Sequence, residues 1–284
     1  MSVPHVSVHA LRYSSSPGRR ASEVYYHHGL YGEPDDAVGM DYFFWLVRTP
    51  TKTVVVDCGF STGTAAIRDR RIDTPAEELL ARMGTSLESV DHVVLTHMHF
   101  DHVGNTGLFP RATFHMARAE YDYWTGQYRD RPAFSWPVEP PDLDAVQALH
   151  ASGRLWLLDD EQQLTPEVLL TRLPGHTPGQ LVTEVSGGTR QVVLASDAMH
   201  YYDEVRQDRP FYLFTDLVGM YDAYTWLREL DARPVTDVVP GHDPEVAKRY
   251  EEVERDCFDL LAPVSASTAP RSLGAGVAHP DIRV

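Results

Sequence analysis

The sequence predicts an α/β protein in which strands and helices mix throughout two β-rich halves. Short apolar runs typical of buried strands recur along the 284 residues, and several of them end in a turn with a histidine or an aspartate. Neither an internal repeat nor a break in composition divides the chain. We therefore expect one domain over residues 1–261 and a C-terminal tail over residues 262–284. The tail either lies along the surface or packs onto a second subunit of a homodimer.

In the first half, dense apolar runs predict buried strands, and helices are expected at 73–84 and 117–126. The expected strands cover residues 5–13, 41–49, 53–59, 91–96 and 112–116.

The helix expected over 73–84 carries the clearest local signals. Thr74 is expected as the N-cap, Pro75 as the first helical residue, Glu77 as the partner in a capping box, and Gly84 as the residue that ends the helix.

In the second half, a turn at 186–189 is expected to join two strands into a hairpin. The expected strands cover 154–159, 168–173, 180–186, 190–197 and 236–240, and the expected helices cover 142–153, 218–232 and 244–261. Residues 126–141 hold four prolines and are expected to form a loop or lid.

The charge of the chain excludes two classes of partner. It has 41 acidic residues against 25 Lys and Arg, a formal net charge of −16, so nucleic acids and anionic membranes would repel it. No run approaches the roughly 18 apolar residues that span a bilayer, and the N-terminus lacks the apolar core of a signal peptide. Cys58 and Cys257 form no close pair, so neither a disulfide framework nor a thiolate metal site is indicated. We expect a cytoplasmic protein.

Residues 97–102 place three histidines and an aspartate directly after the apolar strand 91–96. Buried imidazoles need hydrogen-bond partners, and several of them together are costly unless something positively charged lies among them. The alternative is a set of surface-loop histidines that bind water. The dense spacing favours a metal site.

Three further segments end a strand or begin a turn with a suitable ligand: His176, Asp197 and His242. Imidazoles and carboxylates without thiolates suit two divalent cations, with Zn²⁺ expected and Fe, Mn or Co as alternatives. In the division that we expect, one metal binds His97, His99 and His176, a second binds Asp101, His102 and His242, and Asp197 bridges them.

These segments together resemble the metallo-β-lactamase superfamily. The resemblance rests on "THMHFDHVGN", on "VVVDCG" before it, and on "PGHTPG", "ASDA" and "VPGHDP" after it, and it runs from about residue 41 to about 250. Within the superfamily the chain most resembles the N-acyl homoserine lactonases and related lactone hydrolases. The resemblance implies an αββα sandwich with the two-metal site at one edge of the β layers. It implies the same seven ligands, supported by Asp57 at the end of its strand.

The chain departs from these lactonases at one position. Many of them place a tyrosine three residues after the bridging aspartate, where its hydroxyl assists the substrate carbonyl. Here that residue is His200, followed by Tyr201 and Tyr202. Either His200 takes over the polar role, or one of the two tyrosines reaches the site, or all three pack in a lid.

The expected reaction is the opening of a lactone ring, plausibly of an N-acyl homoserine lactone or another small lactone. A hydroxide held between the metals would attack the carbonyl, Tyr201 or His200 would stabilise the oxyanion, and Asp101 would relay a proton to the leaving alkoxide. Aromatic residues in 201–216, 121–124 and 131–137 would form an apolar wall for the rest of the substrate.

Other functions remain open for the same ligand set. It could hydrolyse a thioester, as in glyoxalase II-like enzymes, although no basic cluster for glutathione is evident in the sequence. It could also hydrolyse a β-lactam, carry out redox chemistry with iron, or serve as a non-catalytic scaffold.

Overall fold

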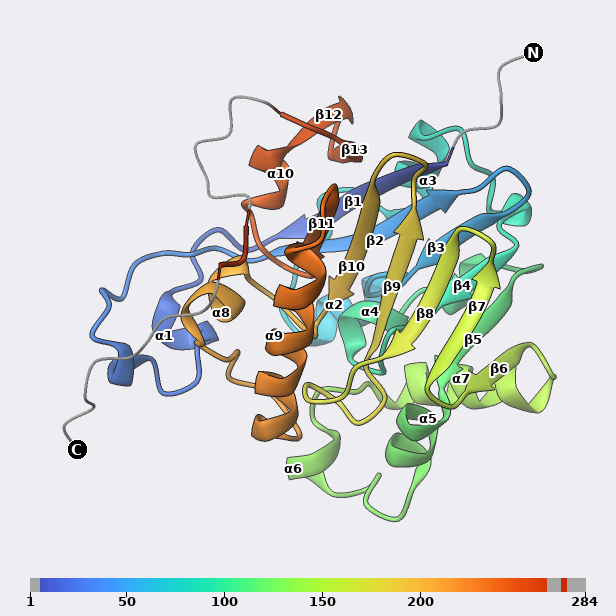
Figure 1. The fold of residues 1–284 in the computed structure, drawn as a ribbon. Helices are drawn as coiled ribbons and strands as arrows, with labels where there is room; N and C mark the ends of the chain where they lie inside the picture. Colours follow the sequence, from blue (N-terminus) through green and yellow to red (C-terminus); the bar gives the residue numbers. More distant parts are fainter. Residues whose placement is uncertain (1–5, 265–271, 275–284) are drawn as a thin grey trace.

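The computed structural model describes residues 6–264 and 272–274, and they form two β-sheets that pack face to face between helices (Figure 1). The eight-stranded sheet has the order β12-β13-β1-β2-β3-β4-β5-β6, and the five-stranded sheet has the order β11-β10-β9-β8-β7. This arrangement is the predicted αββα sandwich, which is confirmed.

The strands of the eight-stranded sheet are β1 (Ser7–Ser15), β2 (Asp41–Arg48), β3 (Thr53–Val56), β4 (His92–Val94), β5 (Thr113–Ala117), β6 (Leu155–Leu158), β12 (Tyr250–Glu254) and β13 (Cys257–Pro263). Those of the five-stranded sheet are β7 (Glu161–Thr165), β8 (Val168–Arg172), β9 (Leu181–Ser186), β10 (Gln191–Ser196) and β11 (Thr236–Pro240).

The helices are α1 (Ala21–Val24), α2 (Thr62–Ile67), α3 (Ala76–Arg82), α4 (Phe100–Val103), α5 (Arg118–Thr125), α6 (Pro132–Ser135), α7 (Pro140–Ala151), α8 (Tyr202–Gln207), α9 (Leu217–Asp231) and α10 (Val246–Arg249). Among the described residues, no helix has the length and apolar character needed to cross a membrane.

Both faces of the central strands β2 to β5 are buried, which explains their continuous apolar runs. Along β2, Trp45 and Val47 join the core between the sheets, whereas Phe44 and Leu46 join the core on the opposite face, together with residues of α3 and α7. Helix α9 lies beside the five-stranded sheet (Figure 1), where Leu227 packs into the inter-sheet core.

The parallel strand pairs place their carboxyl ends at one edge of the sandwich. Strands β3, β4, β5 and β6 run parallel in the first sheet, and β10 runs parallel to β11 in the second. The loops that follow β3, β4, β10 and β11 therefore meet at the same edge.

The helix predicted over 244–261 is wrong. Only Val246–Arg249 is helical, and β12 and β13 form a hairpin that turns at Asp256, which has a left-handed φ of 63°. The charged residues of this segment favour a helix locally, but β13 pairs with the open edge of β1, with His9 opposite Asp259. Pairing across the sheet outweighs the local preference.

Smaller differences concern where elements begin and end. Helix α3 begins at Ala76 with Pro75 at its N-cap position and no side-chain cap, because the Thr74 amide donates to the carbonyl of Tyr13 and Thr74 lies buried before the helix. The expected loop 126–141 contains α6 and the start of α7, and β7 and α8 were not predicted.

The predicted boundary at residue 261 falls inside a strand, since β13 continues to Pro263. Leu273, in the expected tail, packs into the inter-sheet core. The rest of the tail lies outside the described residues, and a single domain remains a prediction.

We predict that Leu260→Ala lowers the free energy of unfolding by about 2–5 kcal/mol, because the fully buried Leu260 would leave a cavity in the inter-sheet core. Val253→Ala on the neighbouring β12 is the control, since Val253 is 41% exposed and should change stability by no more than about 0.5 kcal/mol. Denaturant unfolding measures both. Equal losses of stability in the two variants would show that Leu260 of the hairpin does not pack in the inter-sheet core.

Candidate metal centre

The loops at one edge of the sandwich bring all seven predicted ligands together. Each of them is at least nine-tenths buried: His97, His99, Asp101, His102, His176, Asp197 and His242. The stretch 97–102 follows β4 and continues into α4, His176 follows β8, Asp197 follows β10 and His242 follows β11.

The ligand atoms form two groups, each with all its donor atoms within 4.8 Å of one another. The first group consists of His97, His99, His176 and Asp197, and the second consists of Asp101, His102 and His242. This is the division that the sequence predicted, with Asp197 placed in the first group.

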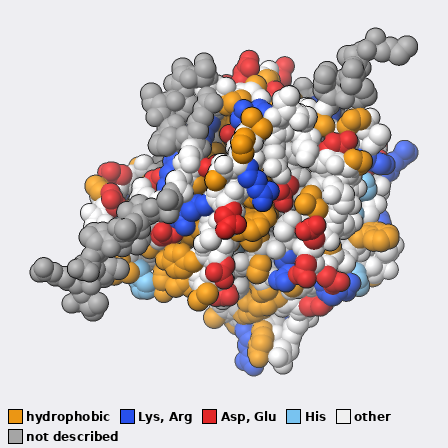
Figure 2. Space-filling model, in the orientation of Figure 1, with side chains coloured by type: hydrophobic (Ala, Val, Ile, Leu, Met, Phe, Trp, Pro, Cys, Tyr) orange, Lys and Arg blue, Asp and Glu red, His pale blue; other side chains and the backbone are white. Residues whose placement is uncertain are grey.

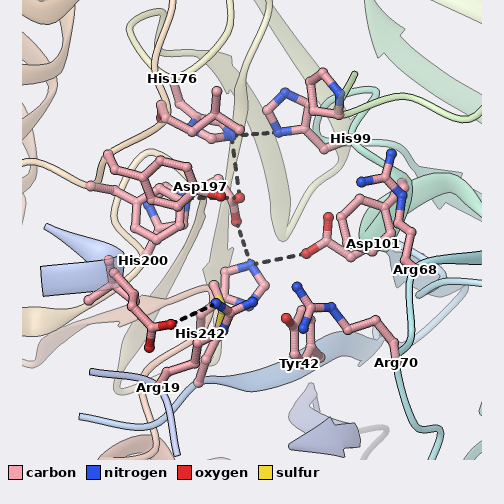
Figure 3. Close-up of a pocket in the computed structure, with 18 of the residues that line it drawn as sticks. Arg19, Tyr42, Arg68, Arg70, His99, Asp101, His176, Asp197, His200 and His242 are labelled. Atoms are coloured by element: carbon pink, nitrogen blue, oxygen red, sulfur yellow. Dashed lines mark hydrogen bonds and ion pairs between the residues drawn. The ribbon is translucent and has the colours of Figure 1, made fainter. Parts of the chain in front are cut away.

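The Asp197 carboxylate lies between the two groups (Figure 3). Its Oδ2 is 3.3 Å from His176 Nε2 and 3.6 Å from His97 Nε2. Its Oδ1 is 3.1 Å from His242 Nε2 and 3.4 Å from His102 Nε2. One oxygen therefore faces each group, so Asp197 could help to hold a cation in either group. Asp101 lies on the far side, with its Oδ2 3.7 Å from His242 Nε2.

The hydrogen bonds of the outer ring nitrogens aim the imidazoles inward. The Nδ1 atoms lie 2.7 Å from Asp57 Oδ2 for His102, 2.8 Å from the Asp41 carbonyl for His242, 2.9 Å from the Leu213 carbonyl for His176 and 3.1 Å from Thr96 Oγ1 for His97. Such bonds fix both the tautomer and the direction of a metal-binding imidazole.

The inner atoms fit a cation. Among the described residues, Nε2 of His97, His102 and His242 and Oδ1 of Asp197 are buried with no hydrogen-bond partner. A buried polar atom left unpaired costs about 1–3 kcal/mol. Imidazole and carboxylate donors are those that zinc-class divalent ions take, so a pair of such cations would satisfy these atoms.

Burial keeps several of these imidazoles neutral, the form that binds metal. It lowers the pKa of His97 and His176 well below 6.5 and that of His99 to about 3. Burial also opposes the charge on His102, but the nearby carboxylates, Asp197 first, outweigh it and hold the His102 pKa well above 6.5. The Asp197 pKa is well below 3.8 because the surrounding imidazoles, His200 first, overcome the effect of burial.

Asp57, expected to support the site, lies directly behind it. Its fully buried carboxylate accepts hydrogen bonds from the Thr96 amide at 2.8 Å and from the Ser196 hydroxyl at 3.3 Å, besides its contact with His102. Asp57 and Ser196 both have left-handed backbones, with φ values of 59° and 47°. Strained residues of this kind persist only where surrounding structure holds them. A Cβ on Gly241 would lie 2.8 Å from Asp197 Oδ1, so only glycine fits there.

Glu120, a residue that the sequence analysis did not single out, ties two ligand loops together. Its fully buried carboxylate accepts from the Met98 amide at 2.9 Å, from Trp124 Nε1 at 2.6 Å and from the Gly179 amide at 3.0 Å. Met98 lies between His97 and His99, and Gly179 follows His176 by three residues. No local sequence signal marks such a carboxylate, because the two partners that connect it to the ligand loops are backbone amides.

The three residues after the bridging aspartate have different surroundings. His200 Nε2 lies 3.0 Å from Asp197 Oδ2, and His200 Nδ1 lies 3.2 Å from Glu204 Oε1. Burial opposes the charge on His200, but Asp197 and Glu204 together raise its pKa to about 9. Tyr201 donates its hydroxyl to the Gly39 carbonyl at 2.8 Å, and the Tyr202 ring packs against the Arg249 guanidinium. Glu204 was also missed, although its position at N3 of α8 is a capping-box spacing.

A pocket opens onto the cluster, and His200 lines it, whereas Tyr201 is not among its lining residues. Ligands His99, Asp101, His176, Asp197 and His242 form one part of the lining, and apolar or aromatic side chains form another: Val24, Met40, Tyr42, Phe100, Trp136, Phe211, Tyr212 and Leu213. The aromatic segments 131–137 and 201–216 therefore both contribute to the expected apolar wall.

We predict that Asp57→Asn weakens Zn²⁺ binding about 10–100-fold, because the amide cannot accept two hydrogen bonds and orient His102 as the carboxylate does. The melting temperature as a function of Zn²⁺ concentration reports the affinity, since bound metal stabilises the folded state. Asp91→Asn is the control. Asp91 lies at the opposite end of β4, where it accepts from the Thr53 amide. Unchanged affinity in Asp57→Asn would exclude the supporting role.

The comparisons with known proteins agree with this geometry. The family model described as the metallo-beta-lactamase superfamily matches residues 40–242. An N-acyl homoserine lactonase of Bacillus cereus is 24% identical over 233 residues, which cover 76% of this chain and 86% of that protein. The N-acyl homoserine lactonase AttM of Azorhizobium caulinodans is 29% identical over 184 residues, 60% of this chain and only 64% of that relative's length.

Solved structures show the same fold. A quorum-quenching N-acyl homoserine lactone lactonase superposes with a TM-score of 0.65 at 17% identity, covering 93% of this chain and 99% of that one. The dizinc quorum-quenching lactonase AidC gives a TM-score of 0.66 at 19% identity, covering 86% of this chain and 90% of that one. With a matching family model over more than half of its length and the ligand set in place, the chain belongs to the metallo-β-lactamase superfamily, whose members include metal-dependent hydrolases.

Proposed function

We propose that this metal-dependent hydrolase opens the ring of a lactone, in the class of N-acyl homoserine lactones and related small lactones. The observation that carries the proposal is the Asp197 carboxylate, which faces both ligand groups at the floor of a pocket with an apolar wall. The names of the similar proteins, N-acyl homoserine lactonases among them, support the choice of substrate.

We propose Zn²⁺ as the resident metal, held by the seven ligands in their two groups, because the donors are imidazole and carboxylate without thiolate. When bound, two such cations would supply Lewis acidity and lower the pKa of water toward about 7.

Asp101 is the proposed proton relay. Its carboxylate lies in the pocket lining, where its oxygens face His102 and His242 at 3.7 Å. A carboxylate beside the attacking water can hold the proton that the water loses and pass it to the alkoxide that leaves the opened ring.

His200 is the proposed group that stabilises the carbonyl oxygen. It lines the pocket, Glu204 behind it favours its protonated form, and the face of its ring stacks on Phe211 with centroids 3.7 Å apart. The Tyr201 hydroxyl already donates its hydrogen bond to the Gly39 carbonyl. We therefore favour His200 over Tyr201 in this role.

Other features remain proposals. We propose a cytoplasmic location, in keeping with two buried cysteines that form no disulfide, and a small-molecule substrate without nucleic acid or membrane partners. A homodimer remains a proposal as well.

We predict that the zinc-loaded protein hydrolyses lactones and that His97→Ala abolishes both turnover and binding of one metal, since His97 is a ligand of the first group. A pH-indicator assay would test short- and long-chain acyl homoserine lactones, simple γ- and δ-lactones, a glutathione thioester and a chromogenic β-lactam. Turnover of the thioester or the β-lactam alone would keep the metal site and replace the substrate.

We further predict that His200→Ala lowers kcat for the best lactone about 10²–10³-fold, the usual cost of removing one oxyanion donor. Tyr201→Phe should retain activity within about threefold and lose stability instead, because a buried carbonyl loses its donor. Steady-state kinetics and thermal melting separate the two effects. The reverse ranking would make Tyr201 the catalytic residue.

A further inference from the structure

Three arginines line the pocket that opens onto the ligand cluster: Arg19, Arg68 and Arg70 (Figure 3). They come from two separate loops, before α1 and after α2, so the sequence alone does not show that they gather. Basic side chains are not gathered in this way everywhere, since acidic and basic side chains are interspersed on the face shown in Figure 2.

Two of the three arginines are held by partners within the protein. Arg68 forms an ion pair with Glu139 at 2.5 Å and donates to the Trp136 carbonyl at 2.6 Å. Its guanidinium lies over the Phe100 ring, 4.0 Å from the centroid. Phe100 lies in the chain between His99 and Asp101, so Arg68 is fixed next to the ligand loop. Arg19 makes a longer contact, 3.6 Å, with Glu23.

Arg70 has no such partner. Among residues 6–264 and 272–274, no acidic side chain forms an ion pair with Arg70, and its Nε is buried with no hydrogen-bond partner. The left-handed backbone at Asp69, with φ of 50°, separates Arg70 from Arg68, and both arginines line the pocket. The next residue, Arg71, is different, because it is largely exposed and pairs with Asp73.

The three guanidinium groups act on the same part of the pocket. Burial raises the pKa of Tyr212, and the positive charges of Arg19, Arg70 and Arg68 all oppose that shift. Burial also raises the pKa of Tyr42 to about 12, against the charges of Arg70 and Arg19. Arg19 and Arg70, which come from the two loops, therefore both act on the same two pocket tyrosines.

The acidic side chains that line the pocket do not compensate all of its positive charge, so the pocket could bind an anion. Its acidic lining residues are Glu23, which contacts Arg19, and Asp101 and Asp197, which belong to the candidate metal centre. Two divalent cations would more than neutralise those two carboxylates. The Arg70 charge then remains uncompensated, in a chain whose net charge is −16. A partly buried guanidinium without a partner is costly unless a ligand supplies the anion.

We propose that the substrate carries an anionic group, a carboxylate or a phosphate, in addition to the carbonyl that reacts, and that Arg70 binds this group with Arg19 and Arg68 beside it. The proposal rests on the proposed hydrolysis and narrows its substrate, among the related small lactones, to those that carry such an anionic group. A guanidinium fork suits either anion, because it donates two parallel hydrogen bonds.

The test compares a γ-lactone that carries a ring carboxylate with the same lactone as its neutral carboxamide, using the zinc-loaded protein. We expect the wild type to prefer the acid, and Arg70→Met to lower kcat/KM for the acid at least about tenfold while changing that of the amide less than about twofold. Arg70→Lys should recover part of the loss. Arg118→Met is the matched control, since Arg118 is half exposed and pairs with Asp159 on a different part of the surface.

A binding measurement separates this proposal from the hydrolysis itself. Calorimetry would measure glutarate and inorganic phosphate binding to the zinc-loaded wild type, Arg70→Met and Arg118→Met. Weaker binding of either anion in Arg70→Met alone would support the anion site even if no lactone were hydrolysed, and the anion whose affinity falls more in that variant would be the one that Arg70 prefers. Equal kcat/KM for the acid and the amide, together with equal anion affinity in all three proteins, would overturn the anion site. The proposed lactone hydrolysis would still stand.

Discussion

The Asp197 carboxylate, buried among the inward-facing nitrogens of five histidines, is the interaction on which the rest of this site depends. Oδ2 faces His97, His176 and His200, and Oδ1 faces His102 and His242. Attraction to one carboxylate does not satisfy so many buried nitrogens, since four of the five histidines keep an Nε2 without a hydrogen-bond partner among the described residues. Bound cations would satisfy these atoms, so we expect metal binding to stabilise this edge of the fold as well.

Contacts within the protein also hold the two ligand groups in place. Two left-handed residues, Asp57 and Ser196, end strands of opposite sheets and contact each other, and Gly241 lets the loop after β11 approach Asp197 without a Cβ in the way. Glu120 connects two of the ligand loops, because its carboxylate accepts hydrogen bonds from a backbone amide in each of them. The sandwich therefore fixes the separation of the two ligand groups through backbone contacts as well as through side chains.

The sequence predicted features that depend on local patterns, and it failed where contacts with distant residues decide the structure. That the seven candidate ligands gather was predictable, because each follows a short apolar strand and the carboxyl ends of parallel strands meet at one edge. Glu120 was not predictable, since a glutamate that accepts from backbone amides leaves no pattern of its own. The helix predicted over 244–261 failed for a related reason. Its charged residues suit a helix, and only the open edge of β1, distant in the sequence, makes β13 a strand.

The metal ligands and the rest of the pocket come from different parts of the fold. Most ligands stand at strand ends that two sheets hold rigid, whereas Arg19, Arg70 and Trp136 come from loops around the opening. Loops can change without disturbing the strand ends, so a shared ligand set predicts a reaction class more securely than a substrate. His200 in place of the usual tyrosine and an unpaired arginine in the wall lie within that variable part. An arginine without an acidic partner beside the cluster supports the proposal of a substrate more acidic than a neutral acyl lactone.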